Sequence, residues 1–338
     1  MKKTISFIFL TIRASLIFAQ VPLTVEGVEV KSTVEGVWYG YNVLRDHPTT
    51  FIFRNNSITS VNASGYMLQA GDEGITKTNN HLDGEIITGN RFIWNGTDKT
   101  SITHGLFTGY NVNAIIKYNY LDKVPMGIIR KSYGMKDVSG VIAYNIIKNP
   151  ISTCVVVKGM NNVRIYNNTF YSNLGTYDGP GIGTWRGLVE IYANEKFTPP
   201  IASTGVKVKN NIFYTKYQIA NIHIYEKENL PGFESDYNVF YCEAGTPMFN
   251  YLGNDKTFAQ WQELGYDRHS VVVNPNFKNI TDFIPATRLN YGTDLGAKFR
   301  TGLSTTSTWN LGVSPETENQ NGIWQAGARI YKVNNANP

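Results

Sequence analysis

The chain has 338 residues, and its 31 Lys and Arg residues against 26 Asp and Glu give a formal net charge of +5 at pH 7. Lys2, Lys3 and Arg13 all fall in the first 19 residues, which contain no acid, so the rest of the chain has 28 basic and 26 acidic residues and a charge of +2. A nearly neutral chain gives no electrostatic reason to expect a nucleic acid partner. With only two cysteines, a metal site built from cysteines is excluded.

Residues 1–19 have the pattern of a secretory signal peptide. Two lysines precede two apolar runs, Ile5–Leu10 and Leu16–Ala19. We expect cleavage after the second run, and therefore a secreted or periplasmic protein. No other stretch is long and apolar enough to span a membrane. Residues 20–338 are expected to form a single domain and a monomer, because a stack of repeats grows along one axis without dividing.

Residues 21–50 contain a doubled Val-Glu-Gly-Val pattern, at Val25–Val28 and Val34–Val37. They are expected to form the first coil of a repeat structure or a strand that covers its open end. Such an end exposes unpaired strand edges and needs protection.

A repeat runs from about residue 51 to residue 243. Each copy has an apolar residue, two variable residues, Asn, one variable residue and a second apolar residue, except that the last copy begins with Ser235. The intervals between successive asparagines run from 23 to 43 residues. Short β-rich units of this length predict an all-β fold, a coil of parallel strands. The repeated asparagines are Asn56, Asn90, Asn119, Asn145, Asn168, Asn211 and Asn238.

The asparagines are expected at the bends between two strands of each coil. Asn tolerates left-handed backbone geometry, and its side-chain amide can bond the same residue one coil above and below. A preference of Asn for loops would not explain the apolar residue two places after it in every copy.

A further strand in each coil carries the candidate site, and five such segments align on alternating apolar residues. The predicted inward residues are Phe107, Ile129, Val157, Ile191 and Ile224. The predicted outward column contains Thr108, Arg130, Lys158, Tyr192 and Tyr225, and the column two places earlier contains Leu106, Ile128, Val156, Glu190 and His223.

Strands in neighbouring coils lie roughly 4.8 Å apart, so the polar members of both columns predict one patch about four strands wide. Insertions at residues 176–184 and 195–203 are expected to form the walls of a sugar-binding groove, because long loops on one face of a solenoid commonly carry the binding site. The residues expected to contact the substrate are Tyr225, Lys131, His104, Trp185 and Arg186.

This set of residues suits β-elimination from a uronic-acid polysaccharide, which needs a cation for the carboxylate, a base for the C5 proton and an acid for the leaving oxygen. Arg130 is expected to bind the carboxylate and Lys158 to be the base. Tyr192, Tyr225 or His223 is expected to be the acid, and Glu190 lies among them.

Two other functions stay open. Glycoside hydrolysis needs a pair of carboxylates, and Glu190 has Asp178 or Glu195 as a second member. A non-catalytic carbohydrate-binding or surface-adhesion module would present the same aromatic and cationic residues as a shallow face without a catalytic group.

The repeat fades beyond Asn238, and residues 244–330 are expected to form a C-terminal cap. Thr257–Leu264, followed by Gly265, has the pattern of a short capped helix. Loops are expected from there to Ile330.

The C-terminal part of the chain resembles the closing region of secreted right-handed parallel β-helix proteins of the pectate-lyase-like superfamily. The residues that carry the resemblance are Ser235–Tyr241, Phe258–Gly265, His269–Phe277 and Asn321–Ala328. Together with the repeated asparagines, it implies a right-handed parallel β-helix with capped ends. The superfamily contains lyases, hydrolases, epimerases and adhesins, so the resemblance does not choose an activity.

A more distant resemblance is to the alginate lyase and chondroitinase B group, which combines a Lys and an Arg on adjacent coils with calcium held by acidic side chains. Arg130 and Lys158 are similar to that pair in reverse order, and Glu226 and Glu228 to its acidic pair, although Asn-Leu-Pro-Gly follows where the group has a Lys. Calcium is therefore the one cofactor that the resemblance implies. The residues themselves indicate none.

Overall fold

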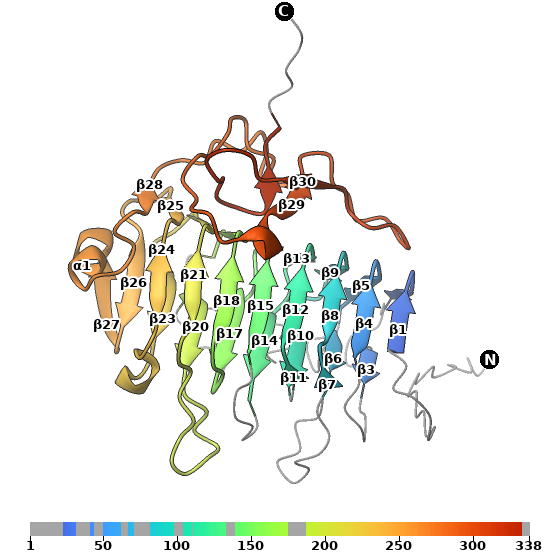
Figure 1. The fold of residues 1–338 in the computed structure, drawn as a ribbon, viewed down its shortest axis with the longest axis horizontal. Helices are drawn as coiled ribbons and strands as arrows, with labels where there is room; N and C mark the ends of the chain where they lie inside the picture. The colour runs from blue at the N-terminus through green and yellow to red at the C-terminus, as the bar shows by residue number, and fades with distance from the viewer. Residues whose placement is uncertain are drawn as a thin grey trace, which may run out of the picture.

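The structure is a computed structural model, and it describes residues 23–31, 41–43, 50–61, 67–70, 82–97, 104–109, 111–132, 139–174 and 187–332. Almost all of the regular secondary structure is β, and most of the strands assemble into three long sheets, here named A, B and C (Figure 1). The chain passes from sheet A to sheet B to sheet C and returns to sheet A one coil further along. This arrangement is consistent with the expected parallel β-helix.

Neighbouring strands within each sheet are parallel, apart from β27 at the end of sheet C. Sheet A contains β1 (Leu23–Glu26), β4 (Phe51–Arg54), β8 (Ile86–Thr88), β12 (Ala114–Lys117), β15 (Gly140–Ala143), β18 (Val163–Tyr166), β21 (Lys207–Lys209) and β24 (Glu234–Asp236). Sheet B contains β2 (Glu29–Lys31), β5 (Ser57–Ser60), β9 (Arg91–Trp94), β13 (Tyr120–Asp122), β16 (Ile146–Lys148), β19 (Thr169–Ser172), β22 (Ile212–Thr215), β25 (Val239–Cys242) and β28 (Val271–Val272). Sheet C contains β3 (Tyr41–Val43), β6 (Leu68–Ala70), β10 (His104–Gly109), β14 (Met126–Lys131), β17 (Val155–Lys158), β20 (Gly187–Tyr192), β23 (Ala220–Ile224), β26 (Met248–Tyr251) and β27 (Asn254–Thr257).

Residues 21–50 were expected to form the first coil or a covering strand. The strands β1, β2 and β3 pair in parallel with β4, β5 and β6, so the described part of this stretch is a first coil. Two short strands, β7 (Leu82–Asp83) and β11 (Asn111–Val112), pair with each other outside the three sheets.

The core fills the inside of the coil with one apolar side chain from every second position of the strands. Because successive coils place the same residue types above one another, the aromatic side chains stack. Phe213 lies between Phe170 and Phe240, with ring centroids 5.1 and 5.0 Å away. The stack buries large apolar surfaces along the whole axis, which is the main favourable contribution to folding.

The repeated asparagines form a continuous ladder at the bends between sheets A and B. At a typical step, the Asn145 side-chain oxygen accepts from the Asn119 backbone N–H at 2.9 Å and from its side-chain amide at 3.0 Å. The Asn145 amide donates in turn to Ile116 O, at 2.9 Å, and to the next Asn of the ladder. All seven predicted asparagines take part, so the predicted ladder is confirmed.

The left-handed backbone at these bends belongs to the residue before each ladder Asn. The φ angle is +60° at Tyr118 and +52° at Asn167, and Gly89 at +67° takes the same position before Asn90. The prediction that the ladder asparagines themselves have this geometry is therefore wrong. The ladder side chains must point into the coil to reach one another, and the left-handed residue before each makes the turn that aims them inward.

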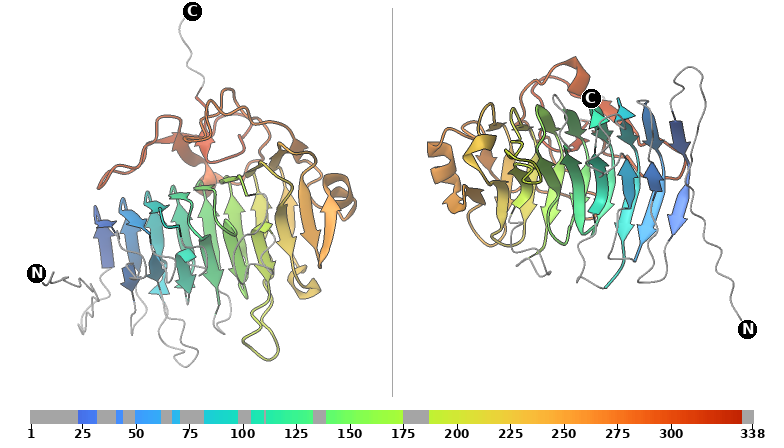
Figure 2. Two further views of the ribbon diagram at one scale, coloured as in Figure 1. Left: turned by 180° about the vertical axis from the view of Figure 1, so that it is seen from behind. Right: turned by 90° about the horizontal axis from the view of Figure 1, so that it is seen from below.

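The side chains of several left-handed residues point outward and hold a segment formed by residues 273–332, here called the C-terminal segment. Asn210 donates to Thr293 O at 2.8 Å, and Tyr118 donates to Thr301 O at 2.8 Å. The segment lies along one edge of the coil and runs back toward the first coil (Figures 1 and 2). Loops were expected here, but part of the segment forms a small sheet of β29 (Thr301–Ser304), β30 (Thr317–Asn319) and β31 (Arg329–Ile330).

The last coil is covered by α1 (Phe258–Glu263), at the place where a short helix was expected. Thr257 caps its N-terminus in a capping box with Gln260, which satisfies two otherwise unpaired backbone N–H groups. Trp261 is fully buried and stacks on Phe249 of β26, with ring centroids 4.8 Å apart. Two short 3₁₀ helices span Lys227–Asn229 and Ala297–Phe299.

Within the described ranges, no helix has the length and apolar character needed to cross a membrane. The expected signal peptide lies outside the described residues.

Candidate functional site

The register of sheet C brings most of the predicted site residues onto adjacent strands. Lys158 of β17 pairs with Tyr192 of β20, and Glu190 pairs with His223 of β23. Alternating residues of these strands, among them Val157 and Ile191, belong to the apolar core. Lys158, Glu190, Tyr192 and His223 therefore share the outer face of sheet C, as predicted.

The predicted register between β14 and β17 is wrong by one residue. Arg130 pairs with Val157 instead of Lys158, and Lys131 pairs with Lys158. Arg130 therefore lies on the inner side of the strand and is fully buried. Ile129, expected inside, pairs with Val156 and shares the outer face with it.

Arg130 forms a buried ion pair instead of contacting the outer face. Its Nη1 lies 3.8 Å from Glu85 Oε2, and its Nη2 donates to Ser139 O at 2.9 Å. Burial raises the pKa of Glu85 to about 8, against the opposing effect of Arg130, and burial lowers the pKa of Arg130 to about 10. The role of Glu85 could not be predicted from the sequence, because its partner Arg130 belongs to a different coil.

Two lysines from neighbouring strands lie side by side at the edge of the outer face. Lys131, expected to contact the substrate, is the last residue of β14 and pairs with the last residue of β17, Lys158. The Lys158 ammonium donates to Glu195 Oε1 at 2.6 Å and lies 5.1 Å from the centre of the Tyr192 ring. An ammonium over the face of an aromatic ring is attracted by the negative face of the ring.

Beside these lysines, Glu190 and His223 form a buried pair. His223 Nδ1 lies 3.2 Å from Glu190 Oε2, and their side chains are 3% and 0% exposed. The other Glu190 oxygen accepts from the backbone N–H of Gly187. An added Cβ at Gly187 would lie 2.9 Å from His223 Cβ, so only glycine fits there. The Glu190 carboxylate thus lies beside Nδ1 at ion-pair distance without hydrogen-bond geometry, and Nε2 is the ring nitrogen on the side away from Nδ1.

Two tyrosines continue the pair toward solvent. The Tyr225 ring stacks on His223 with centroids 3.7 Å apart, and the Tyr192 ring meets Tyr225 edge-on at 4.9 Å. Burial, followed by the nearby Glu190, raises the pKa of Tyr192 well above its usual range. Its phenol is therefore a proton donor at neutral pH and not a base.

Glu195 begins a short hairpin whose base is the pairing of Asn194 with Ile201. This is the described part of the predicted wall at residues 195–203. Burial pushes the pKa of Glu195 up, but the hydrogen bond from Lys158, a backbone hydrogen bond, the charge of Lys158 and, least of these, the charge of Lys131 together outweigh it, so the pKa falls below its usual value.

Three of the predicted substrate-binding residues cannot be placed. Trp185 and Arg186 lie outside the described residues, as does the wall expected at residues 176–184. His104 begins β10, but its side chain lies outside the described part of the structure.

Of the acidic pair suggested by the resemblance, Glu226 has structural contacts. Glu226 Oε2 accepts from Ala193 N at 3.0 Å and from Asn229 Nδ2 at 2.7 Å, and Glu228 is exposed. Among the residues that the structure describes, no three His, Cys, Asp or Glu side chains are grouped so that they could hold a metal ion.

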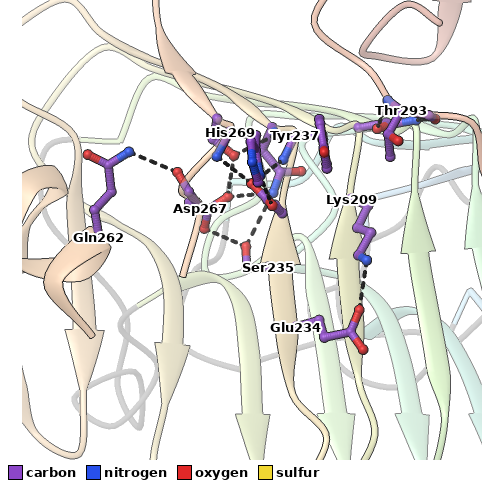
Figure 3. Close-up of polar contacts among 12 residues, drawn as sticks. Lys209, Glu234, Ser235, Tyr237, Gln262, Asp267, His269 and Thr293 are labelled. Carbon is purple, nitrogen blue, oxygen red and sulfur yellow. Dashed lines mark hydrogen bonds and ion pairs between the residues drawn. The ribbon is translucent and has the colours of Figure 1, made fainter. Parts of the chain in front are cut away.

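A second polar cluster closes the asparagine ladder. Asp267 is fully buried and accepts hydrogen bonds from four side chains. Figure 3 shows it beside one of these donors, Ser235. Burial raises its pKa against the effect of these four bonds. A buried carboxylate with this many donors is a structural anchor of the last coil. The donors are Ser235, Asn238, Trp261 and Ser270.

An exposed histidine lies beside that anchor. His269 Nδ1 is 2.6 Å from Asp236 Oδ2, and its ring stacks on Tyr237 (Figure 3). No nucleophile or second cation among the described contacts converges on His269, so the outer face of sheet C remains the candidate site.

The chain was also compared with known proteins. No protein family, curated protein or solved structure matches it.

Proposed function

We propose that this chain is a secreted polysaccharide-active protein that cleaves an acidic, uronic-acid-containing glycan by β-elimination on the outer face of sheet C. One observation carries the proposal: two lysines on adjacent strands lie next to a buried Glu-His pair on the following strands. That combination offers cations for a carboxylate beside a group that can exchange a proton.

The contacts suggest a division of roles that differs from the one expected from sequence. Lys131 and Lys158 bind the substrate carboxylate, because Lys158 already binds a carboxylate, that of Glu195, at 2.6 Å. Once the two ammonium groups neutralise the carboxylate, it can take up by delocalisation the negative charge that develops when the C5 proton leaves. Arg130 takes no part in this scheme, because it is buried on the inner side of β14.

His223 is the proposed base, with Glu190 holding its Nδ1 side. His223 Nε2 takes the C5 proton, the C5–H electrons form the C4–C5 double bond, and the C4–O bond breaks. Tyr225 or Tyr192 gives its phenolic proton to the leaving oxygen. The high pKa of Tyr192 keeps that proton in place until the oxygen leaves.

The fold supports the same proposal at the level of architecture. Three long parallel sheets and the asparagine ladder are compatible with a right-handed parallel β-helix of the pectate-lyase-like superfamily. We infer membership of that superfamily, with right-handed coiling as the normal sense for parallel strand connections. Export through the N-terminal signal belongs to the same proposal.

A second candidate is a non-catalytic glycan-binding module. The observation that favours it is the burial of Glu190 and His223, at 0% and 3% side-chain exposure. If a substrate does not reach these two residues, the remaining binding surface consists of the half-buried Lys131 and Tyr225 and the exposed part of the Lys158 side chain. Glycoside hydrolysis is less favoured, because Glu190 lies against His223 and Glu195 is bonded by Lys158. The remaining candidate carboxylate, Asp178, lies outside the described residues.

The test is an ultraviolet assay for the unsaturated uronate product, with the mature protein against pectate, alginate and chondroitin, with and without calcium. A signal that is lost in Lys158→Ala and His223→Gln supports the lyase. The matched control is Lys209→Ala, because Lys209 donates to Glu234 in the same way on sheet A, at 2.7 Å. Binding without any product would favour the module.

A further inference from the structure

The Lys158–Glu195 pair joins two side chains with very different exposure. The Lys158 side chain is 12% exposed and that of Glu195 is 67% exposed. The cation is thus part of the sheet face, whereas the carboxylate approaches it from the solvent side. A ligand carboxylate arriving from solvent would take the same approach.

The hairpin that carries Glu195 is anchored at its base. Asn194 is fully buried, its backbone bonds Ile201 in both directions, and its side chain donates to Ser132 O, next to Lys131. In Figure 1 the chain after β20 projects beyond the end of sheet C. Glu195 is therefore presented to the lysines by a built turn rather than by a free loop.

Both lysines act on this one carboxylate. Lys158 bonds it directly, and the charge of Lys131 also favours its ionised form. The Tyr192 ring, 5.1 Å from the ammonium, would still hold Lys158 in place without Glu195.

We propose that Glu195 occupies the subsite of the substrate carboxylate and must be displaced when an acidic glycan binds. This inference rests on the proposed function. It makes Glu195 an internal competitor that lowers affinity for anionic chains and selects ligands able to supply a carboxylate at that point. Displacement is feasible because an ion pair with one largely exposed partner contributes little free energy.

The test is the dissociation constant of a uronic-acid oligosaccharide, an oligogalacturonate or an oligomannuronate, for wild type and Glu195→Gln. Glutamine keeps the shape and removes the charge. We expect about two- to fivefold tighter binding at low salt, with the difference shrinking as salt screens the pair. The control is Glu263→Gln, which removes an exposed charge on α1 at the far end of the stack.

In a Lys158→Met background, Glu195→Gln should bring no gain, because the competitor no longer has a partner. The same oligosaccharide with its carboxylates reduced to alcohols should bind wild type and Glu195→Gln equally. An unchanged or weaker affinity in Glu195→Gln, or an equal gain in Glu263→Gln, would overturn the inference while leaving the proposed function intact. If neither wild type nor Glu195→Gln binds any uronate, the proposed function fails and the inference fails with it.

Discussion

The bends between sheets A and B and the outer face of sheet C both bury polar side chains, but in opposite ways. At the bends, the same residue recurs in seven successive coils and each Asn bonds the next. On sheet C, the corresponding positions hold Ile129, Val156, Glu190, His223 and Asn250, and no residue recurs.

The difference separates structural polarity from functional polarity. Each ladder Asn forms hydrogen bonds with the Asn of the next coil, so the repeat itself supplies the partners of these polar side chains. A Glu-His pair in a column without a repeated residue must be held by local features, here Gly187 and Tyr225. In a stack of repeats, a buried polar residue that departs from the repeat is therefore the better candidate for function.

The largest expected effect is on catalysis, and it tests whether the buried His223 is functional and not structural. If the proposed function holds, His223→Gln should lower the rate of product formation by about 10²- to 10⁴-fold, the usual contribution of a general base. The thermal midpoint should change little, because glutamine can still reach Glu190. Retention of the wild-type rate would remove His223 from the mechanism.

The second effect concerns the buried pair on the inner side of the coil. At a pH above about 8, where Glu85 is ionised, Arg130→Met should lower the free energy of unfolding by about 3–5 kcal/mol, because it removes the cation beside the buried Glu85 carboxylate. Denaturant titration measures the loss, and Glu85→Leu in the same chain should recover much of it. A stable Arg130→Met variant that has lost activity would instead support the role expected from sequence.

The same pair predicts a dependence of stability on pH. The folded-state pKa of Glu85, about 8, lies above its ordinary value of 4.5. Its contribution to stability is therefore complete below about 4.5 and is lost as the pH rises through 8. One proton limits the slope to about 1.4 kcal/mol per pH unit. Unfolding measured across this range should show the slope in wild type and lose it in Glu85→Gln.

The smallest expected effect concerns the stability of the asparagine ladder at the bends between sheets A and B. Asn145→Ala should cost about 2 kcal/mol, because it leaves the Asn119 N–H and the Ile116 carbonyl without their partners. Any activity should fall only as far as the folded fraction falls. A loss of activity in fully folded protein would show that the bend and sheet C are coupled.

The sequence predicted the fold correctly where each coil carries the same recognisable residues. An Asn with an apolar residue two places after it recurs in each copy, and this recurrence predicted the coil of parallel strands. The register between β14 and β17 failed because these strands are buried on both faces. Before their terminal cations, Met126–Ile129 and Val155–Val157 contain only apolar residues and one glycine, so alternation cannot tell inside from outside.

Other parts of the site depend on contacts that no local pattern marks. Glu85 meets Arg130 across two sheets, and Glu195 reaches Lys158 only because Asn194 is anchored beside it. The C-terminal sheet was missed for the same reason, because β29 pairs with strands that lie later in the chain and outside the repeat.

The C-terminal segment also changes how this coil can come apart. In an ordinary solenoid each repeat contacts only its neighbours, so the ends can peel away one unit at a time. Here Gly312 donates to Asn55 O at 2.9 Å, and the backbone of Gly312 lies against Gly27 of the first coil. The first coil and the C-terminal segment thus hold each other. The first coil cannot detach without also breaking its contacts with the C-terminal segment. We therefore expect the protein to unfold in one cooperative step. A substitution that disrupts the contacts of Gly312 should destabilise both the first coil and the C-terminal segment.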